Sequence, residues 1–149
     1  MHIAAQAPTL QQSRLLLAEA GLPTDDLADD PELRLLGIQH DGRWIGVVGL
    51  QPLDGAALLR SLAVAPAERG HGAGAALVAA AEAQAVASGW HELFLLTTAA
   101  AGFFERLGYQ GLSRAEAPAA LRATRQFAQL CPATAQVMRK RLDDAGALS

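Results

Sequence analysis

The sequence holds a single cysteine, Cys131, and this scarcity excludes two kinds of stabilising chemistry. One cysteine cannot form a disulfide within the chain, and a thiolate metal cluster needs several. The sequence therefore predicts no metal site and a fold that rests on its apolar core. So few cysteines are also typical of proteins in a reducing compartment, and we expect the protein in the cytoplasm.

An excess of basic charge and a long apolar run are also missing. Twelve Lys and Arg stand against 15 Asp and Glu, for a net charge of −3 at pH 7. Nucleic-acid-binding proteins usually carry a basic patch, so we expect no nucleic-acid partner. No window approaches the length of about 18 uncharged apolar residues that a membrane span needs. Residues 1–17 lack the basic and apolar regions of a signal peptide, so we expect neither a leader nor a membrane anchor.

What the chain does have is enough apolar residues for one core. Of its 149 residues, 51% are hydrophobic, although only 5% are aromatic. This length suits one domain and leaves little room for a second. We therefore predict a single domain over residues 1–149.

The first expected element is a helix over residues 10–20. Thr9 precedes it and is a good N-cap residue. Leu10, Leu16 and Leu17 would form its apolar stripe.

The order of the remaining elements indicates an α+β domain. Two Asp-Gly dipeptides, at 41–42 and 54–55, favour tight turns between antiparallel strands. Three consecutive strands are therefore predicted, at 34–40, 43–52 and 57–64. The elements predicted after them are a helix over 72–88, a strand at 92–98, a helix over 100–108, extended chain from 109, a helix over 118–126 and a strand at 134–142.

The helix over 72–88 has a narrow face of small and aliphatic residues that suits close packing on a sheet. That face consists of Gly74, Leu77, Val78, Ala81 and Ala85. The strand at 92–98 follows a strand–helix crossover, so we expect it to run parallel to the strand at 57–64.

Residues 66–74, with the sequence PAERGHGAG, carry the strongest functional signal. A glycine-rich loop that leads into a helix binds anions, because the first-turn N–H groups and the helix dipole favour negative charge. Three phosphate-containing ligands compete for such a loop. A Walker loop would end in Gly-Lys-Ser/Thr, whereas this loop continues as Gly-Ala-Ala, which excludes that motif.

The dinucleotide fingerprint G-x-G-x-x-G/A is matched literally by GHGAGA at 70–75. A dinucleotide-binding unit would place an acid at the end of the next strand and would follow a parallel strand. Here the next strand ends in Thr97-Thr98, and the preceding strands form an antiparallel meander. A dinucleotide is therefore the weaker alternative.

The third interpretation comes from a resemblance. The spacing R-x-x-G-x-G at 69–74 resembles the signature of the GNAT acyltransferases, as do LAVAP at 62–66 and FFERLGY at 103–109. The resemblance covers nearly the whole chain. It implies a mixed, mostly antiparallel sheet with helices on both faces, whose parallel fourth and fifth strands splay at the acetyl-CoA site. It also implies acetyl-CoA as co-substrate and an amine as acceptor.

The resemblance assigns the co-substrate contacts to two stretches. The backbone of Leu62, Ala63 and Val64 would pair with the pantetheine arm, and such N–H groups also stabilise an oxyanion. The pyrophosphate would be held by Arg69, Gly70, His71, Gly72, Ala73 and Gly74. Plainer roles are the alternatives: Leu62 and Val64 are also core residues, Arg69 can be solvated, and His71 can contribute its N–H alone.

Acetyl transfer to an amine also needs a base and an acid, because a lysine-like ammonium has a reference pKa of about 10 and the thiolate must be protonated. Many relatives carry a tyrosine in the helix after the fifth strand, where this chain has Phe103 and Phe104. Tyr109, the only tyrosine, is therefore the candidate acid, with a packing role as the alternative. The strand at 57–64 has no carboxylate, which leaves the base to water or requires a neutral acceptor.

Four polar residues are candidates for acceptor contacts. Arg60 and Ser61 lie on the strand at 57–64. Thr97 and Thr98 lie at the end of the strand at 92–98, where they can equally cap the next helix.

Two further resemblances concern the acceptor. Residues 92–109 resemble the acetyltransferase domain of N-acetylglutamate synthase, although Pro132-Ala133 stands where the synthases carry basic residues, which argues against glutamate. The lead into the last strand, Leu130-Cys131-Pro132-Ala133-Thr134, is similar to that of small acetyltransferases from arsenic-resistance operons. These resemblances imply a small amino-acid-like amine, with an arsenic-containing one among the candidates. Cys131 is then either an arsenic ligand or a small buried hydrophobe.

Two other functions stay open from the sequence. One is acetylation of a protein N-terminus or lysine, and the other is acyl-CoA sensing without catalysis. The sequence also leaves a homodimer open.

Overall fold

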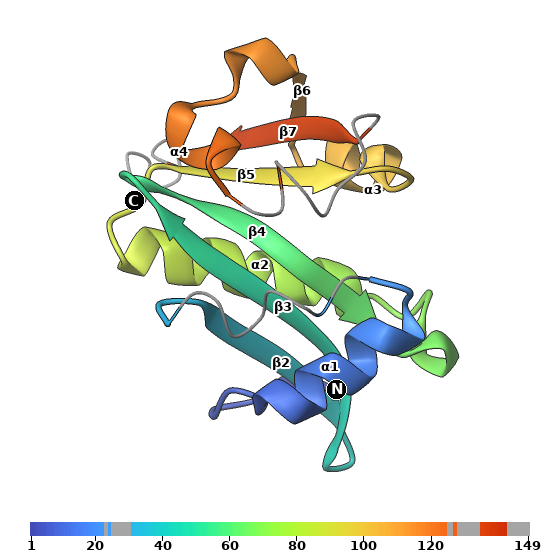
Figure 1. The fold of residues 1–149 in the computed structure, drawn as a ribbon. Coiled ribbons are helices and arrows are strands. Elements are labelled where there is room, and N and C mark those ends of the chain that lie inside the picture. Colours follow the sequence, from blue (N-terminus) through green and yellow to red (C-terminus); the bar gives the residue numbers. More distant parts are fainter. Residues whose placement is uncertain (23, 25–30, 125–126, 128–134, 143–149) are drawn as a thin grey trace. The chain divides into compact units, whose positions relative to one another are not determined.

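The computed structural model describes residues 1–22, 24, 31–124, 127 and 135–142 (Figure 1). Within the described residues the helices and strands follow one another as β1 (His2–Ile3), α1 (Leu10–Glu19), β2 (Arg34–His40), β3 (Arg43–Leu53), β4 (Ala56–Val64), α2 (Ala73–Ala87), β5 (Glu92–Thr97), α3 (Ala101–Arg106), β6 (Gln110–Leu112), α4 (Ala119–Arg122) and β7 (Gln136–Arg141). Two 3₁₀ turns accompany them, η1 (Pro66–Glu68) and η2 (Arg114–Glu116).

The strands form a seven-stranded sheet in the order β1-β2-β3-β4-β5-β7-β6. Strand β5 runs parallel to β4, with Ala57 opposite Leu93 and Leu58 opposite Phe94. The pairs β1–β2, β2–β3, β5–β7 and β6–β7 are antiparallel. The predicted α+β class, the mixed sheet and the parallel β4–β5 pair are therefore confirmed, whereas the two-residue β1 was not predicted.

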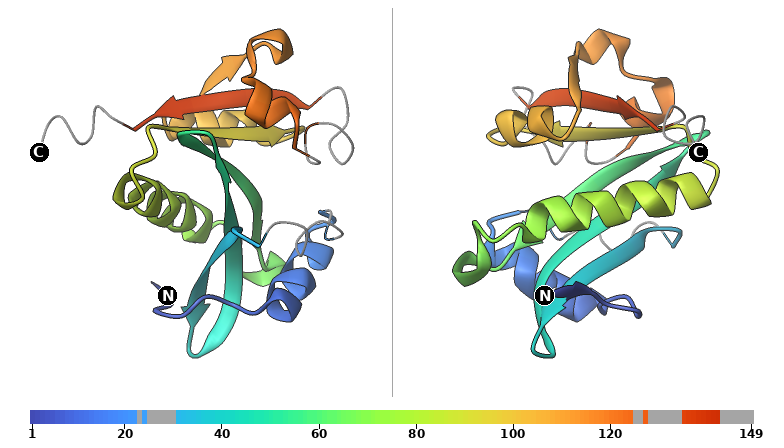
Figure 2. Two further views of the ribbon diagram at one scale, coloured as in Figure 1. Left: turned by 60° about the vertical axis from the view of Figure 1, so that its left-hand side comes forward. Right: turned by 180° about the vertical axis from the view of Figure 1, so that it is seen from behind.

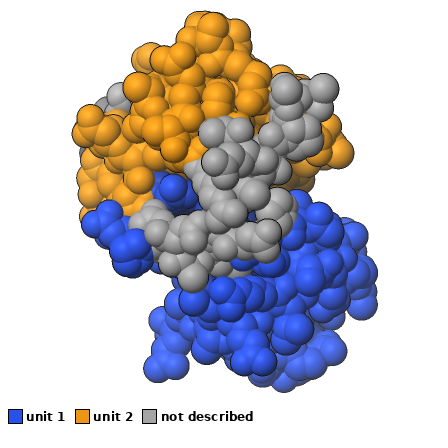
Figure 3. Space-filling model, in the orientation of Figure 1, with its two compact units in different colours: residues 1–51, 59–84 blue, residues 52–58, 85–149 orange. Residues whose placement is uncertain are grey.

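The chain divides into two compact units, which Figure 3 colours separately. The first contains residues 1–51 and 59–84, and the second contains residues 52–58 and 85–149. Strands β3 and β4 each contribute to both units. The two units are described in turn below, and the single domain over residues 1–149 stays a prediction.

In the first unit, α1 and α2 cover opposite faces of the strands. Successive residues of a strand point to opposite faces, so the neighbours Gly46 and Val47 of β3 show which helix covers each face. A Cβ atom on Gly46 would lie 2.8 Å from the Leu77 Cδ1 atom of α2. Val47 packs with Leu16 and Leu17 of α1. The left view of Figure 2 shows the two helices on either side of β2–β4, as predicted.

Helix α1 begins with the predicted cap. The Oγ1 atom of Thr9 accepts a hydrogen bond from the Gln12 N–H at 3.1 Å, and the Gln12 Oε1 accepts one from the Thr9 N–H at 2.8 Å. This reciprocal pair is a capping box. The placement of Leu10 in the apolar stripe was wrong, because its exposed fraction is 39%. Leu10 lies at nearly the same angle around the helix axis as the buried Leu17. It lies about 10 Å earlier along that axis, however, away from the turn of Leu16 and Leu17 that packs in the core.

Helix α2 buries four of the five residues of the narrow face that its sequence predicted, whereas Gly74 is half-buried. Leu77, Val78, Ala81 and Ala85 are each at most 1% exposed. The helix ends one residue inside each predicted boundary, a normal difference for helix termini.

The second unit has its own apolar cluster. Its buried members are Ala56, Leu58, Phe94, Ala117, Leu121 and Val137. They come from the start of β4, from β5 and β7, and from α4 and the turn before it. The predicted helix over 118–126 is the shorter α4, and residues 125–126 lie outside the described part of the chain, as does residue 134 of the last predicted strand.

Candidate functional site

The loop between β4 and α2 combines two left-handed glycines with the start of a long helix. Gly70 has a φ of +85° and Gly72 a φ of +86°. A Cβ atom built on either glycine would meet no atom within 4 Å, so the backbone here borders open space. Helix α2 begins at Ala73 and runs for 15 residues. Its first-turn N–H groups have no acceptor within the helix, and together with the dipole they favour an anion at this loop.

Hydrogen bonds and an ion pair hold this loop against the strands of the first unit. The Nε–H of Arg69 donates to the Val64 carbonyl oxygen at 3.1 Å, which keeps the guanidinium beside the end of β4. The Arg43 Nη2 atom lies 3.4 Å from Glu68 Oε1, so the short turn before the glycines is tied to the β2–β3 hairpin. His71 is exposed and adds a further polar side chain to the loop.

Strand β4 leads into the loop through Leu62, Ala63 and Val64. Ala63 is 4% exposed and packs in the cluster that contains Leu16 and Val47. Leu62 and Val64 are half-buried, so they are less deeply packed than predicted.

The strand is irregular just before these residues. Ser61 has a φ of +59°, a left-handed conformation that non-glycine residues rarely adopt. The next residue back, Arg60, is 5% exposed. Its Nε–H donates to Ser61 Oγ at 3.0 Å and its Nη1 donates to Gln51 Oε1 at 3.3 Å.

Tyr109 lies in the second unit and its side chain is packed. Its exposed fraction is 2%. Its ring contacts Phe104, and the Lys140 Nζ atom lies 5.6 Å from the ring centroid. Lys140 also donates a hydrogen bond of 2.8 Å to the Leu107 carbonyl oxygen. These contacts are those of a packing residue, and packing was the alternative to a catalytic role for Tyr109.

The two threonines at the end of β5, Thr97 within the strand and Thr98 just after it, differ in their contacts. The Oγ1 atom of Thr97 accepts a hydrogen bond of 3.0 Å from the Ala100 N–H. Thr97 therefore closes the turn before α3. It does not cap that helix, which was its alternative role, because the N-cap residue of α3 is Ala100 and no side chain makes a capping bond there. Thr98 is exposed.

The structure thus divides the predicted site residues between the two units. The first unit brings together Arg60, Ser61, residues 62–64 and the loop at 69–74, whereas Thr97, Thr98 and Tyr109 belong to the second. Gln51 was not predicted, because only its hydrogen bond to Arg60 distinguishes it from any polar residue at the end of a strand. Residues 130–134, with Cys131, lie outside the described part of the chain.

The described residues contain neither a group of metal ligands nor a helix that could span a membrane. Within the ranges given above, no three His, Cys, Asp or Glu residues come together in a group that would suit a metal ion. Among the helices of those ranges, none has both the length and the apolar character needed to cross a bilayer.

Residues 5–109 match the family model described as the acetyltransferase (GNAT) family. The chain belongs to this family. The predicted fold and the predicted acyltransferase class are therefore confirmed. Among curated proteins, none matches the chain.

Solved structures of similar fold include an N-acetylglutamate synthase, one of the two kinds of acetyltransferase that the sequence resembled. The N-acetylglutamate synthase of Neisseria gonorrhoeae, complexed with coenzyme A and N-acetyl-glutamate, has a TM-score of 0.77 and 23% identity over 95% of this chain. The match covers only 35% of the synthase chain. A Klebsiella pneumoniae protein proposed to be an acyl-CoA N-acyltransferase has a TM-score of 0.76 and 27% identity, over 94% of this chain and 96% of that one.

A third structure is Rv2747 of Mycobacterium tuberculosis, in complex with coenzyme A and NLQ. It has a TM-score of 0.75 and 19% identity, over 95% of this chain and 99% of that one. At this identity the likeness concerns the fold.

Proposed function

We propose that the protein is an acetyl-CoA-dependent N-acetyltransferase that acetylates the amine of a small amino-acid-like molecule. The observation that most directly supports this proposal is the loop at 69–74, where two left-handed glycines border open space at the start of α2. Membership of the GNAT family supports acetyl transfer as the reaction. The coenzyme A in the synthase and Rv2747 structures supports the co-substrate.

The residues of the first unit fit this co-substrate. Gly70 and Gly72 admit a pyrophosphate close to the backbone, because no Cβ atom stands in its way. The N–H groups of His71, Ala73 and Gly74 donate to it, and Arg69 supplies a positive charge. The backbone of Leu62, Ala63 and Val64 pairs with the pantetheine arm, and their N–H groups polarise the acyl carbonyl.

In the reaction, acetyl-CoA supplies the thioester. An N–C bond to the acceptor amine forms while the C–S bond breaks. The ammonium first loses a proton to water, or the amine arrives neutral, since β4 contains no carboxylate. After the attack the acylated nitrogen releases a further proton, which balances the proton that the leaving thiolate gains. We propose that Tyr109, the only tyrosine of the chain, protonates the leaving thiolate.

The class of acceptor rests on the resemblance to the small acetyltransferases of arsenic-resistance operons. It supports an amino-acid-like amine and includes an arsenic-containing one. Arg60, Ser61, Thr97 and Thr98 are the proposed contacts, although Thr97 already accepts a backbone hydrogen bond. The scarcity of cysteine supports a cytoplasmic setting.

A thiol-release assay tests the proposal. Purified protein and acetyl-CoA are combined with amino acids, an arsenic-containing amino acid, polyamines and short peptides. We expect free thiol to appear with one or more amino acids. Release with peptides alone would overturn the small acceptor, and stabilisation by acetyl-CoA without release on any acceptor would indicate a protein that binds acyl-CoA without catalysis.

A further inference from the structure

Arg69, the first residue of the loop at 69–74, is bonded to the end of the strand that precedes the loop. Its Nε–H donates to the Val64 carbonyl oxygen at 3.1 Å. The N–H of the same peptide group, which belongs to Ala65, donates to the Ile45 carbonyl oxygen of β3 at 2.8 Å. This peptide group is therefore held from both sides, by β3 and by the guanidinium.

The direction of the Val64 carbonyl shows which edge of β4 the Arg69 side chain occupies. In a trans peptide the C=O and N–H groups point in opposite directions. The Ala65 N–H points to β3, so the Val64 C=O points away from β3. Arg69 thus lies at the edge of β4 that β3 does not cover.

The N–H group of Val64 points to the same edge. The Ala63 carbonyl oxygen faces β3, because it lies 3.1 Å from the position of a Cβ atom on Gly46. The N–H of that peptide group belongs to Val64, and it therefore points away from β3. Val64 thus presents one donor and one acceptor at this edge, and Arg69 takes the acceptor.

This edge is the one that the pantetheine arm needs in the proposed function. An arm that pairs with the backbone of residues 62–64 requires an edge that no neighbouring strand covers. Strand β3 covers one edge. On the other edge, β4 pairs with β5 at Ala57 and Leu58, near the opposite end of the strand. The arm and the Arg69 guanidinium therefore meet at Val64.

We propose that Arg69 positions the pantetheine arm through the Val64 carbonyl, in addition to placing its charge beside the pyrophosphate. Because the Nε–H occupies this carbonyl, the arm has one partner at Val64, the N–H. Arg69 thereby fixes the point on β4 at which the pairing of the arm begins. This inference rests on the proposed function and narrows it, since Arg69 contributes to the recognition of two different parts of acetyl-CoA.

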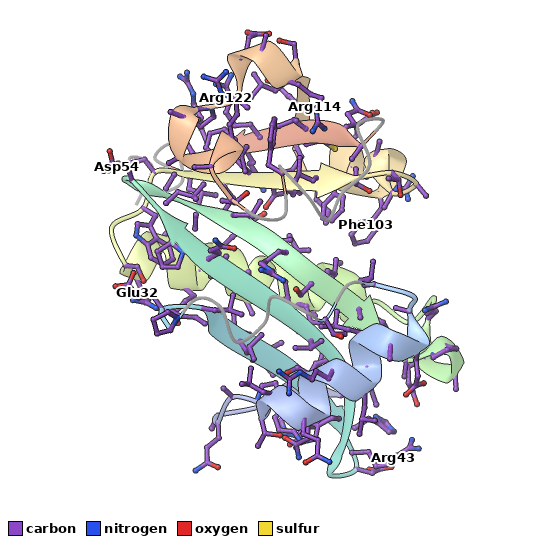
Figure 4. All side chains as sticks on the ribbon, viewed as in Figure 1. Glu32, Arg43, Asp54, Phe103, Arg114 and Arg122 are labelled. Atoms are coloured by element: carbon purple, nitrogen blue, oxygen red, sulfur yellow. The ribbon has the colours of Figure 1, made fainter. Side chains whose placement is uncertain are left out.

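Three variants separate the hydrogen bond of Arg69 from its charge. In Arg69→Gln the Nε2 atom follows Cδ as the arginine Nε does, so a donor to Val64 is kept and the charge is lost. In Arg69→Lys a carbon takes that position and the charge is kept. In Arg69→Met both are lost. The matched control is Arg43→Met, because Arg43 (labelled in Figure 4) is an exposed arginine of the same unit whose Nη2 atom contacts Glu68 instead.

The two ligands are acetyl-CoA and acetyl-pantetheine, which keeps the arm but has no phosphate. Dissociation constants are measured by titration, and the melting temperature without ligand shows that each variant folds. For acetyl-pantetheine, Arg69→Lys and Arg69→Met should raise the Kd about threefold to tenfold, the scale of one hydrogen bond. Arg69→Gln and Arg43→Met should stay within about twofold of the wild type.

For acetyl-CoA, the charge of Arg69 adds an effect of its own. Arg69→Gln should raise the Kd about tenfold or more, because a charged partner of the pyrophosphate is lost. Arg69→Met should raise it most, since it loses both interactions. A role of Arg69 in the fold alone would affect both ligands alike and would not spare acetyl-pantetheine in Arg69→Gln.

Three outcomes would overturn the inference. One is an affinity for acetyl-pantetheine that is absent in the wild type or equal in the wild type and all Arg69 variants, which would leave Arg69 only its charge. Another is an equal loss of that affinity in all three variants, which would make Arg69 a structural residue of the loop. The third, a wild type that binds neither ligand, would also overturn the proposed function, whereas the first two leave it standing.

Discussion

The rings of Phe104 and Tyr109 meet edge to face, with centroids 5.6 Å apart and planes at 73°. Phe103 makes a similar contact with Phe104, at 5.0 Å and 77°. These three aromatics form one cluster in the second unit, with Phe103 and Phe104 on α3 and Tyr109 just before β6. The contact holds the Tyr109 ring independently of its hydroxyl, so removing the hydroxyl alone separates catalysis from packing.

Tyr109→Phe should lower kcat about 10²-fold or more if the hydroxyl protonates the thiolate, the usual scale for a positioned general acid. The KM for acetyl-CoA should change little, because the hydroxyl acts mainly in the transition state. Turnover and thermal stability are measured together. Turnover within about threefold of the wild type would leave Tyr109 as a packing residue and water as the proton source.

Gly72→Asp should abolish binding of coenzyme A, because a carboxylate would stand where the pyrophosphate is expected. The matched control is Gly42→Asp. Gly42 has a φ of +77°, and like Gly72 it has no atom within 4 Å of an added Cβ. Both variants therefore introduce the same charge and a similar backbone strain. Binding is measured by calorimetry, and equal affinity in the two folded variants would place the co-substrate elsewhere.

Acetyl-CoA should raise the melting temperature of the wild-type protein more than NAD or ATP at the same concentration. A ligand that binds only the folded state adds about 2.7 kcal/mol of stability at a hundred times its Kd. Differential scanning fluorimetry measures the shift. A shift with NAD alone would restore the dinucleotide interpretation of residues 70–75.

Thr97→Val should lower the free energy of unfolding by about 1 kcal/mol, because the Ala100 N–H loses its acceptor and β-branched shape is otherwise kept. Thr98→Val, on the exposed neighbour, should change it by less than about 0.5 kcal/mol. Chemical denaturation measures both. If Thr98→Val instead impairs turnover without affecting stability, Thr98 rather than Thr97 contacts the acceptor. Equal stability of the two variants would show that the hydrogen bond between Thr97 and Ala100 contributes nothing.

Local chemistry determined much of the fold directly from the sequence. Thr9 forms its capping box because the donors it satisfies lie within three residues. Asp41 and Gly42 both adopt positive φ, as a tight hairpin turn requires. The glycine-rich loop at 69–74 and the helix start after it were predictable in the same way, since glycines, strand end and helix start are contiguous in the chain.

Tertiary structure alone decided which residues of the site meet. Gln51 and Arg60 are nine positions apart and come together only because β3 and β4 fold back on each other. The left-handed Ser61 has no sequence signal, since a serine in a strand normally adopts extended backbone. Leu10 is exposed and Leu17 buried at nearly the same helical angle, because burial depends on where a helix meets its sheet. Such contacts arise from the packing of distant segments, and a pattern confined to neighbouring residues cannot specify them.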